Sequence, residues 1–219
     1  MRAAEARGDG ELVVIAADVA ARHVETDLVP ALAGRFRVGT VPPIAEPGEI
    51  EELVEDLGAD RWAGVGVGDG GGTLLQAGLD ARPPDALVLL GPRGLDAAMA
   101  HEGLSAWEAP VLILGGEEDP AVPVETLERL HDRMPSSSLG LVPGCGDLLT
   151  DAWDTVGPMV LEYLRARYLR APHGHGDTAG LVALQLERRP PWVDLAEYEV
   201  DDPEPVSLDP ADQEVGPGA

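Results

Sequence analysis

A cluster of glycines directly after an apolar segment constrains this chain more than any other feature. Residues 62–67 predict a buried strand, glycines follow at 68, 70, 71 and 72, and a helical pattern begins near Thr73. Glycine is the residue best suited to a sharp turn, because it adopts backbone conformations that side chains disfavour. The sequence therefore predicts a tight connection from a strand into a helix at this point.

The segments around this turn predict an α/β fold. Over the first 150 or so residues, short apolar runs alternate with helical patterns, which indicates a mainly parallel sheet of about six strands with flanking helices. The expected strands are 12–15, 37–41, 62–67, 86–90, 111–114 and 139–142. The expected helices lie near 24–32, 48–58, 73–82, 127–134 and 157–168.

The last fifty residues differ in composition from the rest. Residues 171–219 contain seven prolines, and from Pro190 onward there are nine acidic residues and no basic one. Such a stretch buries too little apolar surface to fold independently. We predict a domain over 1–170 and a Pro-rich acidic tail over 171–219. The tail either docks on the domain or a partner, through residues such as Trp192 and Tyr198, or remains untethered.

Charge and composition exclude several classes of function. The chain has 15 basic residues, all arginine, and a net charge of −25. This charge disfavours nucleic acids and anionic membranes and favours a basic protein partner. No segment is apolar enough for a membrane span or a signal peptide, so we expect a cytoplasmic protein. The single cysteine, Cys145, rules out an intramolecular disulfide.

Three motifs, in their order along the chain, resemble the α/β-hydrolase family. The elbow between strand and helix reads Gly64-Val-Gly-Val-Gly-Asp-Gly-Gly-Gly72. A later strand and turn read Ala109-Pro-Val-Leu-Ile-Leu-Gly-Gly-Glu-Glu-Asp-Pro120, and a last turn reads Val142-Pro-Gly-Cys-Gly-Asp-Leu148. The resemblance covers about residues 12–168. It implies the family fold, with Asp119 as the catalytic acid and Asp147 at the position of the catalytic histidine.

Two of the three catalytic groups that this resemblance calls for are missing. The family chemistry needs a nucleophile, a histidine that takes its proton and an acid that orients the histidine. No serine occurs before residue 105. The nucleophile position is either Gly68, which leaves no nucleophile, or Asp69, which resembles the haloalkane dehalogenase branch; the distance to the next helix end favours Asp69. At the oxyanion hole the chain reads Ala17-Asp18, where an acid would repel the developing charge.

These losses predict a lidless pseudo-hydrolase that acts as an accessory or interaction subunit, with the tail as its docking element. Only 19 residues, 91–109, separate two strands where the family often inserts a lid. One alternative is a hydrolase, lyase or isomerase that uses Asp69, with a base from His173, His175 or a partner. Another is a small-molecule binding protein that uses the vacated pocket.

The resemblance also implies that three carboxylates, those of Asp69, Asp119 and Asp147, converge on one pocket. A cation would then fill the space between them: a hard metal ion, an arginine of the tail or a partner's basic side chain. The alternative is that one or more of the three is solvated at the rim. No resident cofactor is expected. The glycines at 66, 68 and 71 also match a dinucleotide motif, but the next strand ends in Gly91-Pro92 without the acidic residue that such a site requires.

Overall fold

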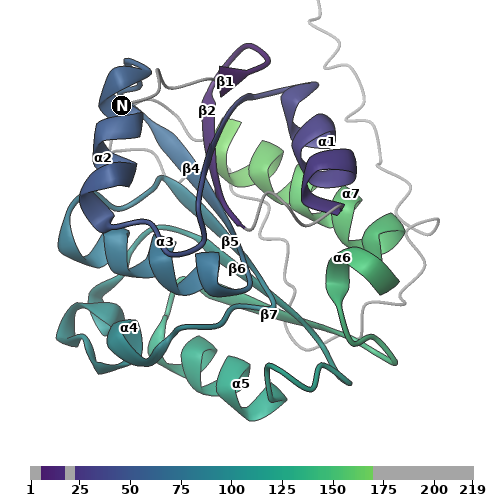
Figure 1. The fold of residues 1–219 in the computed structure, drawn as a ribbon. Coiled ribbons are helices and arrows are strands. Elements are labelled where there is room, and N and C mark those ends of the chain that lie inside the picture. Colours follow the sequence, from purple (N-terminus) through teal and green to yellow (C-terminus); the bar gives the residue numbers. More distant parts are fainter. Residues whose placement is uncertain (1–5, 18–22, 170–219) are drawn as a thin grey trace, which may run out of the picture.

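The protein is described by a computed structural model over residues 6–17 and 23–169. Its centre is a seven-stranded sheet in the order β1-β3-β2-β4-β5-β6-β7 (Figure 1). All neighbouring strands run parallel except β1, which pairs antiparallel with β3. The predicted α/β fold with a mainly parallel sheet is therefore confirmed.

The six expected strands are all present. They are β2 (Leu12–Ala16), β3 (Arg37–Val41), β4 (Trp62–Val67), β5 (Ala86–Leu90), β6 (Val111–Gly116) and β7 (Ser137–Val142). The seventh strand is β1, Ala6–Arg7, in a segment of the sequence too short and too polar to indicate a strand. It forms by pairing with the edge of β3, so tertiary contact rather than local pattern creates it.

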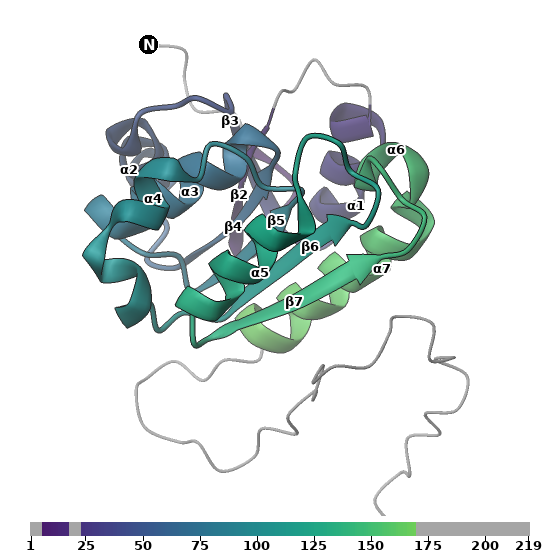
Figure 2. The same cartoon turned by 90° about the horizontal axis from the view of Figure 1, so that it is seen from below.

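Helices cover both faces of the sheet, as Figures 1 and 2 show. One face packs against α2 (Pro47–Asp56), α3 (Asp69–Asp80), α4 (Asp96–Ala100) and α5 (Val124–Arg133). The other packs against α1 (Val29–Ala33), α6 (Leu148–Asp151) and α7 (Trp153–Leu164). Successive residues of the central strands point to opposite faces, so each strand contributes to both cores.

Two π-helical turns and one 3-10 turn complete the described part. The π-helical turns are Val24–Leu28, which leads into α1, and Arg165–Leu169, which follows α7. The 3-10 turn Glu102–Ala106 and α4 fill the connection between β5 and β6, so only short helical segments stand where a lid domain could be inserted. No helix in residues 6–17 and 23–169 is long and apolar enough to cross a membrane.

The helix α3 begins earlier than the sequence predicts. It starts at Asp69 rather than near Thr73, so that three consecutive glycines form its first turn. Glycine is a poor helix former, but these positions lie against neighbouring backbone. A Cβ at Gly70 would overlap the carbonyl oxygen of Ala16, and one at Gly72 would overlap that of Gly94. Close packing of α3 on the strand ends therefore overrides the local preference.

Candidate functional site

The turn between β4 and α3 places Gly68 in a strained conformation. Its φ is 56° and its ψ is −123°, a region that residues with a side chain rarely adopt. Hydrogen bonds fix this geometry: the Gly68 N–H donates to the carbonyl of Leu90 at 3.0 Å, and its carbonyl accepts from the N–H of Arg93 at 2.8 Å. The nucleophile of an α/β-hydrolase occupies the strained residue of this turn. That residue is Gly68.

Asp69 has a different place in the structure. It is the first residue of α3 and lies one position beyond the strained residue. The register favoured by sequence spacing, with Asp69 at the nucleophile position, therefore disagrees with the backbone geometry. Spacing to the far end of α3 was a weak guide, because it depends on where that helix ends and not on the conformation of the turn.

The side chain of Arg93 occupies the space in front of the elbow. A Cβ built on Gly68 would lie 2.8 Å from Arg93 Nη2 and 3.3 Å from its Cζ. The same Nη2 donates a hydrogen bond to Asp69 Oδ2 at 3.2 Å, and both side chains are about half exposed. The cation beside Asp69 is thus an arginine of the domain itself, from the loop after β5. Sequence reasoning missed Arg93, although its place directly after an expected strand end was a usable signal.

Asp119, which the resemblance places at the position of the catalytic acid, has no histidine partner among the described residues. It lies in the loop after β6, where its Oδ1 accepts the N–H groups of Ala121 at 2.7 Å and Val122 at 3.3 Å. The three histidines in the described part of the chain interact elsewhere: His23 with Asp27, His101 with Gly103 and Asp80, and His131 with Ser137. None of these three histidines is therefore hydrogen-bonded to Asp119.

Among the described residues, one histidine and one serine side chain share a hydrogen bond: His131 and Ser137, at 2.7 Å. The hydroxyl of Ser137 also lies 2.7 Å from the carbonyl of Met134. A carbonyl can only accept, so the hydroxyl proton points to Met134, and His131 must donate its own N–H to the serine oxygen. This polarity is the reverse of the one that a general base needs. The hydrogen bond joins the last turn of α5 to the start of β7.

Asp147, which the resemblance places at the histidine position, caps a helix. Its Oδ1 accepts the N–H of Thr150 at 2.8 Å, at the start of α6. In return, Asp151 Oδ2 accepts the N–H of Asp147 at 2.9 Å and that of Gly146 at 3.2 Å. A carboxylate that accepts backbone N–H groups at a helix start is a common N-cap. Asp147 thus has a structural role.

We expect Asp147→Ala to lower the free energy of unfolding by about 1 kcal/mol, the typical cost of losing an N-cap acceptor. Asp147→Asn should cost less, because the amide oxygen still accepts the Thr150 N–H. Urea unfolding followed by circular dichroism measures both. Equal losses for the two variants would show that the capping hydrogen bond is not what Asp147 contributes.

The three carboxylates divide into two groups. Cys145 is buried, and burial raises the pKa of its thiol; the nearby carboxylates of Asp151, Asp147 and Asp119 raise this pKa further. Asp119 and Asp147 thus belong to the surroundings of Cys145, whereas Asp69 is paired with Arg93. The described residues contain no group of three histidine, cysteine or acidic side chains that could hold a metal ion. The described part of the chain thus offers no metal site made by these three carboxylates.

Ala17 extends the end of β2 and is fully buried. Its N–H donates to the carbonyl of Val41 at 3.2 Å, so this donor is engaged within the sheet. Asp18, the second residue of the expected oxyanion position, lies outside the described residues. So do Trp192, Tyr198, His173 and His175, and with them the whole predicted tail.

The glycines of the dinucleotide-like motif face other parts of the protein. A Cβ on Gly66 would lie 2.6 Å from the Cα of Gly71, and one on Gly71 would lie 2.7 Å from the Cβ of Pro92. A side chain at either position would therefore overlap protein atoms, so these glycines allow close packing of neighbouring parts of the protein.

Comparisons with known proteins agree with the fold. Residues 93–174 match the family model described as TAP-like protein. A search of curated proteins found no significant match. Among solved structures, a predicted CIB-like hydrolase from Thermoplasma acidophilum is 14% identical with a TM-score of 0.62, over 71% of this chain and 86% of the other.

Two further solved structures are similar. An esterase from Exiguobacterium antarcticum is 15% identical with a TM-score of 0.61, over 74% of this chain and 94% of the other. The 2-hydroxy-6-oxo-6-phenylhexa-2,4-dienoate hydrolase from Rhodococcus sp. strain RHA1 is 18% identical with a TM-score of 0.60, over 73% and 93%. At these identities the likeness establishes the fold and not an activity. The chain is thus an α/β-hydrolase-fold protein whose residues 93–174 are similar to the TAP-like proteins.

Proposed function

We propose that this protein is a pseudo-hydrolase: a non-catalytic accessory or interaction subunit that works by binding another protein, with its acidic tail as the docking element. The observation that carries the proposal is the elbow. The strained residue is Gly68, which has no side chain, and the guanidinium of Arg93 lies where a nucleophile would project. A nucleophile is the group without which acyl transfer of this type cannot begin.

The other positions of the site support the same proposal. Asp147 uses its carboxylate to cap α6, and Asp119 has no histidine partner among the described residues. A carboxylate at the histidine position cannot relay a proton to a leaving group as imidazole does. Loss of chemistry at several positions leaves a folded scaffold whose surfaces remain available for binding. The net charge of −25 favours a basic partner. We further propose that the protein acts in the cytoplasm of a bacterium.

A screen for turnover tests the non-catalytic part. We expect no hydrolysis of p-nitrophenyl esters or haloalkanes above the buffer rate, because neither Gly68 nor the Arg93–Asp69 pair presents a free nucleophile. Asp69→Asn is the informative variant, and Asp96→Asn, an exposed acid at the start of α4, is its control. Saturable turnover by the unmodified protein that Asp69→Asn abolishes and Asp96→Asn preserves would overturn the proposal in favour of an enzyme that uses Asp69.

The interaction part needs a separate experiment. Affinity purification from the source organism should recover a specific partner with the full chain. The double variant Trp192→Ala/Tyr198→Ala should recover at least tenfold less, because aromatic side chains commonly dominate binding energy at interfaces. Asp212→Asn, which keeps both aromatics, is the control. Equal recovery by the full chain and the double variant would show that the tail is not the docking element.

A further inference from the structure

A hollow at the end of the sheet opposite the elbow contains unused hydrogen-bonding capacity. It lies where the parallel strands begin, has a volume of about 360 Å³, and is lined by Glu11, Arg37, Gly58, Ala59, Asp60 and Arg61. This volume is within the range of about 300–1,000 Å³ that is usual for ligand sites. We call it the amino-edge hollow.

Arg37 is the lining residue with an unsatisfied hydrogen-bond donor. It is the first residue of β3, and its Nε is buried without a hydrogen-bond partner among the described residues. A buried donor of this kind is rarely left unsatisfied, and a guanidinium N–H bonds most strongly to a carboxylate. The lining carries both signs of charge, the guanidinium groups of Arg37 and Arg61 and the carboxylates of Glu11 and Asp60. Arg61 is also bonded to Asp85 and to the carbonyl of Tyr168.

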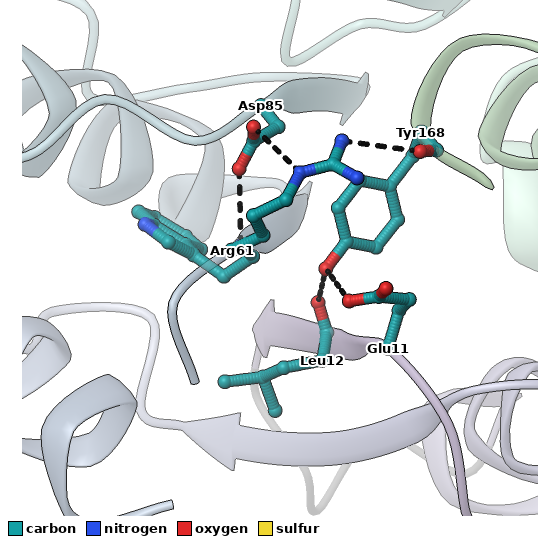
Figure 3. Close-up of polar contacts among 6 residues, drawn as sticks. Glu11, Leu12, Arg61, Asp85 and Tyr168 are labelled. Atoms are coloured by element: carbon teal, nitrogen blue, oxygen red, sulfur yellow. Dashed lines mark hydrogen bonds and ion pairs between the residues drawn. The ribbon is translucent and has the colours of Figure 1, made fainter. Parts of the chain in front are cut away.

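The described chain ends beside this hollow. Figure 3 shows Tyr168 against Arg61 and Glu11: its hydroxyl donates to the carbonyl of Leu12 at 3.0 Å, and its own carbonyl accepts from Arg61 Nη2 at 3.2 Å. Arg61 and Glu11 both line the hollow. The sequence that follows Leu169 is therefore tethered within reach of the hollow, and tethering raises the effective concentration of a segment to roughly millimolar.

We propose that residues 188–200 of the same chain bind in the amino-edge hollow. This segment reads Arg188-Arg-Pro-Pro-Trp-Val-Asp-Leu-Ala-Glu-Tyr-Glu-Val200. Its two arginines complement Glu11 and Asp60, and its acids complement Arg37 and Arg61. The connection from 170 to 187 is 18 residues long, enough to span about 60 Å when extended. The elbow end of the sheet is a poor alternative, because Asp69, Asp119 and Asp147 would repel the acids.

Binding at this place gives the tail a resting position within its own molecule. A partner that takes the tail must compete with the amino-edge hollow, so its apparent affinity is reduced by the fraction of tail already bound. The inference shares with the proposed function only the role of the tail as a binding element. It concerns the isolated protein, so its test requires no partner.

Hydrogen–deuterium exchange of the full chain, followed by mass spectrometry, tests the proposal. At low salt we expect amides in 192–200 to exchange at least tenfold more slowly than in a free peptide of that sequence. Arg37→Gln should bring them to within threefold of the peptide. Arg129→Gln, which removes the same charge from the exposed side of α5, should leave the protection intact.

A second variant covers the case in which Arg37→Gln disturbs β3. The triple change Asp194→Asn/Glu197→Gln/Glu199→Gln leaves the domain untouched and should speed exchange in 58–61. Exchange of 192–200 at the peptide rate in the unmodified protein would overturn the proposal, as would protection that survives both sets of changes. Protection that grows with protein concentration, together with dimers in sedimentation, would also overturn it, since the tail would then bind a second copy. A failed partner purification with protection present would contradict only the proposed function.

Discussion

Gly70→Ala is expected to lower the free energy of unfolding by about 3 kcal/mol or more, enough to leave much of the protein unfolded at 37 °C. The added Cβ would overlap the carbonyl carbon and oxygen of Ala16, both main-chain atoms of β2. A flexible side chain could move aside, but this carbonyl ends a fully buried strand at the centre of the sheet. Relief requires α3 to move away from the sheet and lose the contacts of Leu74 and Leu75.

Gly48→Ala is the matched control. Gly48 also lies in the first turn of a helix, α2, and a Cβ there would meet no atom within 4 Å. Alanine is the better helix former, so this variant should be unchanged or more stable by up to about 1 kcal/mol. Urea unfolding of both variants gives the comparison. A Gly70→Ala protein as stable as the Gly48→Ala protein would mean that α3 does not pack as tightly on β2 as the structure indicates.

Tyr168→Ala is expected to lower the free energy of unfolding by about 3–5 kcal/mol, the range for truncation of a large buried aromatic residue. The Tyr168 side chain is fully buried. Its ring stacks on Phe36 with 6.4 Å between centroids, and the guanidinium of Arg61 lies 5.1 Å from its centre (Figure 3). It joins the turn after α7 to the starts of β2 and β4.

The neighbouring residue Leu169 provides the control. Leu169 is 42% exposed, so Leu169→Ala should lower the free energy of unfolding by less than about 1 kcal/mol. Equal losses of unfolding free energy in the two variants would show that the buried Tyr168 ring does not stabilise the fold more than the exposed Leu169 side chain does.

The hydroxyl of Tyr168 adds a dependence on pH. Burial raises its pKa above the ordinary value of 10.0, and Glu11 and Asp85 raise it further, while Arg61 opposes them. Above about pH 10 the unfolded chain loses this proton and the native protein keeps it, so stability falls as pH rises. Tyr163 and Cys145, whose pKa values burial also raises, act in the same direction.

The variant Tyr168→Phe separates this contribution from the others. It should cost about 1 kcal/mol near neutral pH, from the lost hydrogen bond to Leu12. The difference in free energy of unfolding between the two proteins should shrink by about 1 kcal/mol toward about pH 11. The reason is that the unmodified protein loses stability as Tyr168 ionises in its unfolded chain, whereas phenylalanine has no proton to lose. Urea unfolding at both pH values measures the difference. A deficit that stays constant would show that Tyr168 ionises equally in the folded and unfolded chains.

The fold was predictable because each strand and helix carries its own pattern of apolar residues. Strands such as 86–90 are apolar throughout, as strands buried on both faces must be. The start of α3 was not predictable, since three glycines oppose a helix locally and only contact with Ala16, Pro92 and Gly94 explains them. The strand β1 was missed for a similar reason: two residues carry no period, and their pairing with β3 is a property of the folded chain.

The candidate site was predictable in its parts and not in its arrangement. Sequence order placed Asp69, Asp119 and Asp147 at the ends of strands, where the structure has them. It did not reveal that Gly68 has the strained backbone, because backbone angles at a glycine-rich turn leave no trace in residue spacing. It also missed Arg93, whose long side chain reaches back over the elbow from the next loop. Asp119 and Asp147 were expected to share a cation with Asp69, but each accepts backbone N–H groups of its own turn, and Asp69 pairs with Arg93.

The position of Arg93 bears on any attempt to rebuild an enzyme from this scaffold. Installing a serine at Gly68 and a histidine at Asp147 would create a hydroxyl that projects into a guanidinium, with the cap of α6 removed at the same time. A working design would also have to shorten Arg93, which releases Asp69 from its ion pair and leaves an uncompensated negative charge beside the new nucleophile. A serine–histidine site in this scaffold would thus need several interdependent substitutions, each of which is unfavourable until the others are made.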